Sequence, residues 1–503
     1  MIHDTPQPVQ NPLPRGALPL PGGGFAAALA LGLALLVLPG VPAAPGDPGL
    51  VLQTGDHICI LGNTLAERMQ FDGWLETLLH RRFPGHDLVI RNLGFSADEL
   101  TLRLRSEGFG SPDEHLTNQK ADVILAFFGF NESFAGPEGL EKFRKDLEGF
   151  VSGTLGKKYN GTGAPRLVLF SPIAHEDLED PNYPDGSENN RRLKLYSETM
   201  AEVARKSEVP FVDLFSASLE IYAAAAKPLT INGIHLTEEG NRLLALSIDR
   251  ALHPGSPGPE PDPRPLEALR AAVLDKCFYW FQRHRVVDGY SVFGGRSWLR
   301  FEDAQTNRVV MDRELEILDA MTALRDRRVW AVARGQDFTV DDSSTPPFIP
   351  VKTNRPGPGP GGAHLFLDGE EAIGKMTAAE GMKVNLFASE KEFPDLAKPV
   401  QMAFDTRGRL LVAVMPSYPH WKPKDEMNDK VLILEDTDQD GRADRCTVFA
   451  DKLHVPTGLE LWGGGLFVGQ GPFLLFLKDT NGDDRADFME RMVHGLDTAD
   501  THH

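Results

Sequence analysis

The sequence predicts an α/β domain, a parallel sheet covered by helices, followed by a C-terminal all-β region. From residue 54 to residue 252, short apolar runs alternate with helical patterns, which is typical of strands joined by crossover helices. Beyond residue 376 the apolar runs are separated by Gly, Asp and Pro, with little helical periodicity. A chain of 503 residues has room for about three domains, so both regions fit.

Each element is expected where an apolar run or a helical repeat is clearest. The expected strands of the α/β domain are residues 57–61, 88–92, 123–128, 167–171 and 211–214. Between the first two strands, apolar residues recur at helical spacing on either side of Trp74. The expected strands of the C-terminal region are residues 400–404, 409–414, 431–434, 466–468 and 473–477.

Two proline-rich stretches separate these regions from a helical segment. Residues 253–265 and 341–362 are predicted to be linkers, because proline can neither continue a helix nor donate to a β-ladder. Between them, residues 266–335 show helical spacing, clearest from 311 to 324, and predict a small helical appendage. The domains expected from these boundaries are residues 54–252, 266–335 and 376–503.

The first 44 residues have the three regions of a secretory signal peptide. An apolar run from Phe25 to Leu38 follows Arg15 and precedes the small residues Ala43 and Ala44. The run is too short to span a bilayer comfortably, so we predict cleavage near Ala43 or Ala44. An uncleaved membrane anchor is the alternative. Either way the rest of the chain is expected to be secreted or periplasmic, and no second apolar run of transmembrane length follows.

Charge and cysteine content argue against several classes of function. The chain has 52 Lys and Arg against 72 Asp and Glu, a formal net charge of -20, which repels the phosphate backbone of nucleic acids. The three cysteines, Cys59, Cys277 and Cys446, are far apart and have no zinc, redox or haem-attachment spacing. Nucleic acid is therefore not an expected partner, and disulfides are not expected to organise the fold.

Four short blocks follow expected strands or precede expected helices. They are Gly62-Asn63-Thr64-Leu65, Asn92-Leu93-Gly94, Gly129-Phe130-Asn131 and Asn232-Gly233-Ile234-His235. Together they resemble the motif blocks of the SGNH or GDSL hydrolase superfamily, over residues 54–252. The resemblance implies a flavodoxin-like sheet with a ligand pocket beyond the carboxyl ends of its strands. It also implies ester hydrolysis by a hydroxyl nucleophile, a histidine base and oxyanion donors.

The resemblance gives each matching residue a role, and two positions depart from the family pattern. Gly94 and Asn131 match the oxyanion donors, and His235 matches the general base. Thr64 stands where the family has a nucleophilic serine, and its extra methyl group crowds the attack. Asn232 stands where the family has an aspartate, and it carries no charge to stabilise an imidazolium. In serine proteases the same Asp-to-Asn change lowers turnover by about 10⁴.

Each of these residues also has a purely structural interpretation. Thr64 is placed to cap a helix, Gly94 to form a turn, and Asn131 to satisfy loop backbone groups. His235 is then a structural histidine. The sequence therefore leaves two functions open for this domain. It is either an exported hydrolase of esters, such as acyl groups on carbohydrate, or an inactive protein that binds glycans or another partner.

The C-terminal region contains an internal repeat. The segment VLILEDTDQDGRAD, which begins at Val431, recurs as LLFLKDTNGDDRAD from Leu474, 43 residues later. This period is typical of a four-stranded propeller blade, about 40 to 50 residues. Residues 376–503 would then hold about three blades, whereas closed propellers have roughly four to eight. We therefore expect an incomplete propeller whose missing blades come from a longer gene product or from another chain. A small three-bladed domain or a β-domain of another kind is the alternative.

Several segments of this region resemble a second family. Among them are EGMKVNLFASE, PVQMAFDTRGRL and PTGLELW, which are similar to the N-terminal part of membrane-bound dehydrogenase-like propellers of planctomycete-type bacteria. Those propellers are relatives of sugar dehydrogenases that use a quinone. The resemblance implies a third function, a redox protein similar to sugar dehydrogenases. No residues here identify a quinone site, so no organic cofactor is expected.

Acidic residues alternate in both copies of the repeat, as they do in calcium-binding loops. The first copy offers Asp436, Asp438, Asp440 and Asp444, and the second offers Asp479, Asn481, Asp483 and Asp487. Convergence of their oxygens predicts Ca²⁺ as the one cofactor. Neither loop is complete, because Thr447 occupies the twelfth position of the first and Asp484 replaces the glycine of the second. Solvated turns between strands are the alternative.

Overall fold

The computed structural model describes residues 49–255, 266–353, 355–418, 420–496 and 498. The predicted signal peptide, residues 1–44, lies outside the described residues, and so does most of the predicted linker 253–265. Within the described ranges, no helix has both the length and the apolar character needed to cross a membrane.

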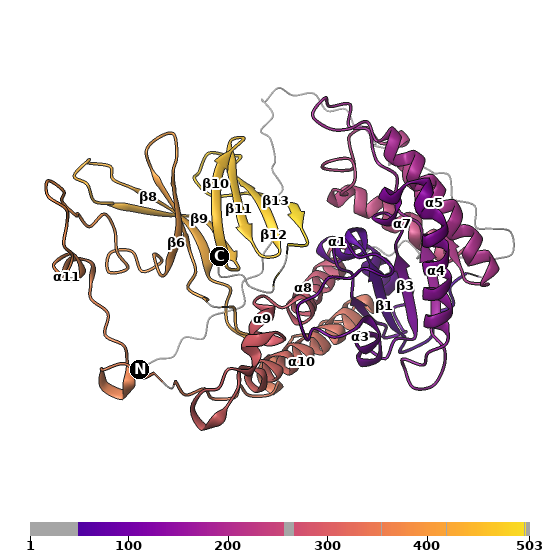
Figure 1. Ribbon diagram of the computed structural model, residues 1–503, viewed down its shortest axis with the longest axis horizontal. Helices are drawn as coiled ribbons and strands as arrows, with labels where there is room; N and C mark the ends of the chain where they lie inside the picture. The colour runs from indigo at the N-terminus through magenta and orange to yellow at the C-terminus, as the bar shows by residue number, and fades with distance from the viewer. Residues whose placement is uncertain (1–48, 256–265, 354, 419, 497, 499–503) are drawn as a thin grey trace, which may run out of the picture. The chain divides into compact units, whose positions relative to one another are not determined.

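The first domain is built on a five-stranded parallel sheet in the order β2-β1-β3-β4-β5 (Figure 1). Its strands are β1 (His57–Gly62), β2 (Val89–Asn92), β3 (Val123–Phe127), β4 (Arg166–Phe170) and β5 (Phe211–Val212). This is the order of flavodoxin-like folds, so the expected α/β class is confirmed. The central strands are buried almost throughout, which explains why their sequences are continuously apolar rather than alternating.

Helices cover both faces of this sheet. They are α1 (Thr64–Asp72), α2 (Trp74–Arg82), α3 (Pro112–Asn118), α4 (Leu140–Leu155), α5 (Ser187–Lys206), α6 (Leu214–Ala224) and α7 (Glu238–Leu252). Successive strand residues face different cores: Ile58 packs with α1, α2 and α7, whereas Cys59 packs with α4 and α5. The helical pattern around Trp74 forms two helices, because Gly73 adopts a left-handed conformation (φ 69°) that ends α1.

A helical hairpin covers the β2 edge of the sheet. It consists of α8 (Leu266–Arg285) and α10 (Asn307–Ala333), with the short α9 (Gly289–Val292) between them. Lys276 of α8 forms a buried ion pair with Glu76 of α2 at 2.7 Å. Arg91 of β2 forms another with Asp326 of α10 at 2.5 Å. The helices found in residues 266–335 are therefore tied to the sheet by buried charges.

The C-terminal region consists of two four-stranded antiparallel sheets, each with its strands in sequential order (Figure 1). The first is formed by β6 (Pro399–Phe404), β7 (Leu410–Val414), β8 (Asp429–Glu435) and β9 (Arg445–Leu453). The second is formed by β10 (Pro456–Trp462), β11 (Gly465–Gln470), β12 (Phe473–Lys478) and β13 (Phe488–His494). The all-β class is confirmed. Residues 376–398 contain turns but no strand, so the described chain holds two sheets of blade size rather than three.

The sequence repeat is also a structural repeat. β8 and β12 are the third strands of their sheets, and each leads into an acidic loop. β9, β10 and β13 are not expected from the sequence, since their partly exposed residues mix polar and apolar types. The remaining short elements are η1 (Glu132–Ala135), η2 (Pro137–Gly139), η3 (Gly295–Trp298), η4 (Glu302–Ala304), η5 (Asp342–Ser344), η6 (Pro360–Gly362) and α11 (Gly369–Ile373).

Candidate functional site

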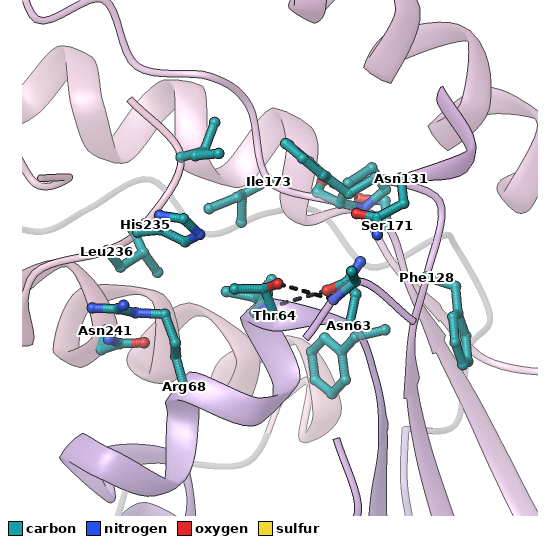
Figure 2. Close-up of a pocket in the computed structure, with 16 residues that line it drawn as sticks. Asn63, Thr64, Arg68, Phe128, Asn131, Ser171, Ile173, His235, Leu236 and Asn241 are labelled. Atoms are coloured by element: carbon teal, nitrogen blue, oxygen red, sulfur yellow. Dashed lines mark hydrogen bonds between the residues drawn. The ribbon is translucent and has the colours of Figure 1, made fainter. Parts of the chain in front are cut away.

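A pocket opens at the carboxyl ends of β1 and β3, where the strand order of the parallel sheet reverses. It encloses about 700 Å³, open solvent at its mouth included. Its polar lining consists of Asn63, Thr64, Arg68, Asn131, Ser171, His235 and Asn241 (Figure 2). Its apolar lining includes Phe127, Phe128, Phe130, Pro172, Ile173 and Leu236. Three predicted catalytic residues, Thr64, Asn131 and His235, therefore lie at one pocket.

Thr64 begins α1 and keeps its hydroxyl hydrogen available. Its Oγ1 accepts a hydrogen bond from the backbone N–H of Ala97 at 3.3 Å. The preceding residue, Asn63, caps the helix, because its side chain accepts from the N–H of Leu65 at 3.1 Å. The interpretation of Thr64 as the helix cap is therefore wrong. Its hydroxyl can donate to a ligand in the pocket.

Gly94 lies against the start of α1 and is not one of the residues that line the pocket. A Cβ atom here would be 2.7 Å from the backbone nitrogen of Glu67, so only glycine fits. Its N–H donates to Oδ1 of Asn92 at 2.8 Å, and Nδ2 of Asn92 donates to the carbonyl of Ala66. The Gly94 N–H is thus already engaged, and its role as an oxyanion donor stays a prediction.

Asn131 follows β3 and lies at the pocket with a free side-chain amide (Figure 2). It precedes η1 without capping it, and its side chain has no hydrogen-bond partner among the described residues. The adjacent Glu132, which sequence reasoning missed, shapes this loop. Its carboxylate accepts from the N–H groups of Leu100 and Gly129, both at 2.9 Å, and burial raises its pKa. The loop thus leaves the Asn131 amide able to donate to a ligand oxygen.

Asn232 and His235 are joined by hydrogen bonds that fix the histidine tautomer. Asn232 Oδ1 accepts from the backbone N–H of Ile234 at 3.4 Å and from that of His235 at 3.0 Å. These donors fix the direction of the amide, so its Nδ2 faces Nδ1 of His235 at 3.0 Å. Because an amide nitrogen only donates, Nδ1 is the acceptor and the ring proton is on Nε2. Asn232 acts on the pocket through His235 and does not line it.

His235 is held as a neutral imidazole. Burial lowers its pKa to about 3, and the positive charges of Arg68 and His494 act in the same direction. The rings of His235 and His494 are 5.8 Å apart. Nε2 of His235 has no hydrogen-bond partner within the part of the chain that the structure describes. It can donate to a ligand, but in this tautomer it cannot take a proton from Thr64.

Arg68 is a pocket residue that sequence reasoning missed. It lies one helical turn after Thr64 on α1, and it lines the pocket together with Asn241 (Figure 2). Its side chain is only 8% exposed. Side chains four positions apart share one face of a helix, so the spacing from Thr64 is the signal that could have revealed it.

The first acidic loop brings three of its four predicted ligands together. Carboxylate oxygens of Asp436, Asp438 and Asp444 lie within 4.8 Å of one another. Asp440 is outside this group, and its carboxylate accepts from the backbone N–H of Arg442 at 2.8 Å. Three converging carboxylates are ligands of the kind that Ca²⁺ prefers. Calcium binding here stays a prediction.

The second acidic loop is arranged differently. Among the described residues, the carboxylates of Asp479, Asp483 and Asp487 form no comparable group. The oxygens of Asp479 are turned to the loop backbone, where they accept from the N–H groups of Asn481, Gly482 and Asp484. Asp484 adopts the left-handed conformation (φ 64°) that the missing glycine would have favoured. Aspartate therefore preserves the turn at this position.

Two family models match the chain. Residues 55–243 match the GDSL-like Lipase/Acylhydrolase family, and this range includes the parallel sheet and all four motif blocks. Residues 55–243 are a GDSL-like lipase/acylhydrolase domain. Residues 368–503 match a domain of unknown function, DUF7133, and include both antiparallel sheets. That match assigns no activity, so the resemblance to dehydrogenase-like propellers stays a prediction.

Solved structures similar to this chain include carbohydrate esterases. An acetylxylan esterase from Geobacillus stearothermophilus, solved as a catalytic mutant, is 17% identical with a TM-score of 0.34, over 41% of this chain and 98% of that one. The acetyl xylan esterase AlAXEase is 18% identical with a TM-score of 0.31, over 39% and 99%. A gut microbial diltiazem-metabolizing enzyme is 16% identical with a TM-score of 0.33, over 41% and 48%. This chain thus spans about half the length of that enzyme.

No curated protein matches the chain. The identities and TM-scores of the solved structures are low.

Proposed function

We propose that the GDSL-like domain binds an acyl ester in its pocket and that hydrolysis by the triad route is suppressed. The observation that carries this proposal is the hydrogen bond from Asn232 Nδ2 to His235 Nδ1. A triad histidine takes the nucleophile's proton on Nε2, while its Nδ1–H donates to a carboxylate. Here Nε2 already holds the ring proton, so it has no lone pair for the proton of Thr64.

The other groups of the pocket suit an ester. The Nε2–H of His235, the amide of Asn131 and the hydroxyl of Thr64 can each donate a hydrogen bond to an oxygen. The phenylalanine and aliphatic side chains around them suit an acyl chain. Donors and apolar walls without a competent base favour binding over turnover.

Ester hydrolysis is the second candidate function. It is favoured because Thr64, Asn131 and His235, which match a nucleophile, an oxyanion donor and a base, line a single pocket. For this chemistry His235 must adopt its other tautomer. Asn232 would then have to reverse its amide and lose two backbone hydrogen bonds. The sequence resemblance supports an acyl group on carbohydrate as the ester, and the signal-peptide pattern of residues 1–44 supports an exported protein.

Binding and turnover can be measured together on the full chain. Ethyl butyrate is titrated by calorimetry, and release of butyrate is followed in the same solutions. We expect saturable binding with hydrolysis no faster than in buffer alone. Fast release of butyrate would support the second candidate, and absence of both binding and release would reject both candidates.

We also infer that the two C-terminal sheets are blades of a propeller. Support comes from their sequential strand order and from the acidic loop that follows the third strand of each. Apolar side chains are exposed on an edge strand of each sheet, Met402 and Phe404 on β6 and Met489 and Val493 on β13. Further blades would cover such residues. Light scattering on the full chain tests whether a second copy supplies this cover, and a monomer would contradict that arrangement.

A further inference from the structure

We propose that the pocket selects a ligand that carries a carboxylate next to an apolar chain, and that Arg68 recognises this carboxylate. The inference rests on the proposed function, because it assumes that the pocket binds a ligand, and it specifies the chemistry of that ligand. Of the described residues that line the pocket, Arg68 alone has a charged side chain, and none is Asp or Glu. The pocket therefore presents a single positive charge to whatever enters it.

The guanidinium of Arg68 is buried but incompletely paired. Nε has no hydrogen-bond partner among the described residues, and Nη1 donates to the carbonyl of Arg491 at 3.1 Å. The carboxylate of Glu490 is 3.7 Å from Nη2, which is longer than a hydrogen bond. Charged donors that are buried without a hydrogen-bond partner destabilise the protein. A ligand carboxylate would accept these hydrogen bonds and recover part of that free energy.

Neighbouring acidic groups do not complete this pairing. Glu67 is committed to Arg285, at 2.8 Å. Burial raises the pKa of Asp72 to about 6, which leaves this carboxyl mostly ionised at neutral pH, but its Oδ2 accepts from Nδ2 of Asn241. Arg491 adds a second positive charge, and burial lowers the pKa of Arg68. None of these acidic groups accepts a hydrogen bond from Arg68, so Nε stays open to an anionic group of a ligand.

Three further polar groups on the wall also favour an anionic oxygen. The amide of Asn131, the hydroxyl of Thr64 and the Nε2–H of His235 all donate, and Figure 2 shows Thr64, His235 and Arg68 around the same pocket. A planar guanidinium can hold a carboxylate through two parallel hydrogen bonds. The apolar walls suit an alkyl chain or ring but no second charge. The ligand class is therefore a monocarboxylate with an apolar chain, the acid that a bound ester would yield.

The test compares hexanoate with hexanol on the full chain by isothermal titration calorimetry at neutral pH, because the two probes share a chain length and differ in charge. We expect hexanoate to bind at least about tenfold more tightly, the low end for a hydrogen bond to a charged group. Arg68→Met should remove this preference, and Arg68→Lys should retain part of it. Arg407→Met, at an exposed arginine, is the matched control and should leave the preference unchanged. Glu490→Gln should tighten hexanoate binding, because it removes a competing carboxylate.

Equal binding of hexanoate and hexanol would overturn the inference, and so would an unchanged preference in folded Arg68→Met. If Arg68→Met does not fold, Glu490→Gln decides, since unchanged or weaker hexanoate binding contradicts the inference. Failure here is distinct from failure of the proposed function. Ester binding without a preference for carboxylate leaves the proposed function standing, whereas no binding of ester, acid or alcohol rejects both.

Discussion

The side-chain amide of Asn232 donates to Nδ1 of His235 over 3.0 Å, while its oxygen accepts the backbone N–H of the same histidine. The two hydrogen bonds act together. The backbone group determines which end of the amide is oxygen, and this determines which ring nitrogen carries the proton. One asparagine thus converts a histidine that would serve as a base into a hydrogen-bond donor.

Replacing this asparagine should convert the pocket into an esterase. In Asn232→Asp, the carboxylate can accept from both the backbone N–H and Nδ1–H, so Nε2 of His235 becomes free and the pKa of the ring rises. Thr64→Ser removes a crowding methyl group. In the double variant we expect kcat/KM for nitrophenyl butyrate to rise at least about 100-fold over the parent chain.

The control for this experiment is His235→Ala in the double variant, which should return the rate to background. Activity that persists without His235 would show that another base acts. No gain in the double variant would show that the pocket is not a triad masked by two substitutions.

His454 should make the C-terminal region sensitive to acid. Its buried ring accepts from the N–H of Trp421 at 3.2 Å, and burial, with His420 nearby, lowers its pKa from 6.5 to about 3. Below pH 6.5 His454 is protonated in the unfolded chain, whereas in the folded chain it stays neutral until the pH approaches 3. The free energy of unfolding should therefore be highest above that pH and fall toward pH 3, by up to about 1.4 kcal/mol per pH unit for this group.

Urea unfolding followed by tryptophan fluorescence measures this acid dependence. His454→Gln should flatten the slope between neutral and acidic pH, whereas His364→Gln, at an exposed position, should not. An identical slope in the parent chain and in His454→Gln would assign the acid sensitivity to other groups.

Asp326→Asn should be strongly destabilising. The substitution leaves the guanidinium of Arg91 buried without its counterion, which typically costs about 3 to 5 kcal/mol. Asp312→Asn in the same helix is the matched control, because Asp312 pairs with Arg308 at the surface, where a pair contributes about 0 to 1 kcal/mol. Chemical denaturation compares the two variants. Similar losses for both would contradict the structural importance of the Arg91 pair.

Calcium should stabilise the C-terminal region through the first acidic loop. Because Asp436, Asp438 and Asp444 converge there, a bound ion would favour the folded state by mass action, about 2.7 kcal/mol at 100 times Kd. Thermal melts of the full chain with chelator and with excess calcium measure the effect. Asp438→Asn should reduce the shift, and the corresponding Asn481→Ala in the second loop is the comparison. Equal melting temperatures in chelator and in calcium would contradict calcium binding and would indicate that the loop is a solvated turn.

Local pattern is sufficient to predict the parallel sheet, because its buried strands carry continuous apolar runs. β9 and β13 cannot be predicted in this way, since charged residues interrupt their apolar residues, Arg445 and Asp451 in β9 and Glu490 and Arg491 in β13. The position of the helical hairpin is also beyond local pattern. The position of the hairpin depends on ion pairs such as Arg91 with Asp326. These two residues are 235 positions apart, and the sequence around either one does not indicate the other.

Motif spacing predicts part of the site for a physical reason. Thr64 and Asn131 follow neighbouring parallel strands, whose carboxyl ends meet at one edge of the sheet. The direction of the Asn232 amide is not set by residue type, because it depends on two backbone N–H groups. Arg68 lies beyond the end of the first motif block, so only its helical spacing from Thr64 marks it.

The hairpin on β2 also sets an order of events while the chain is being made. Arg91 leaves the ribosome 235 positions before Asp326, and Glu76 leaves 200 positions before Lys276. At about 5 to 20 residues per second, these intervals last roughly 10 to 50 seconds. Until α8 and α10 emerge, the β2 edge is uncovered, and Arg91 and Glu76 lack their partners Asp326 and Lys276. The nascent chain therefore offers chaperones a strand edge that the finished protein hides.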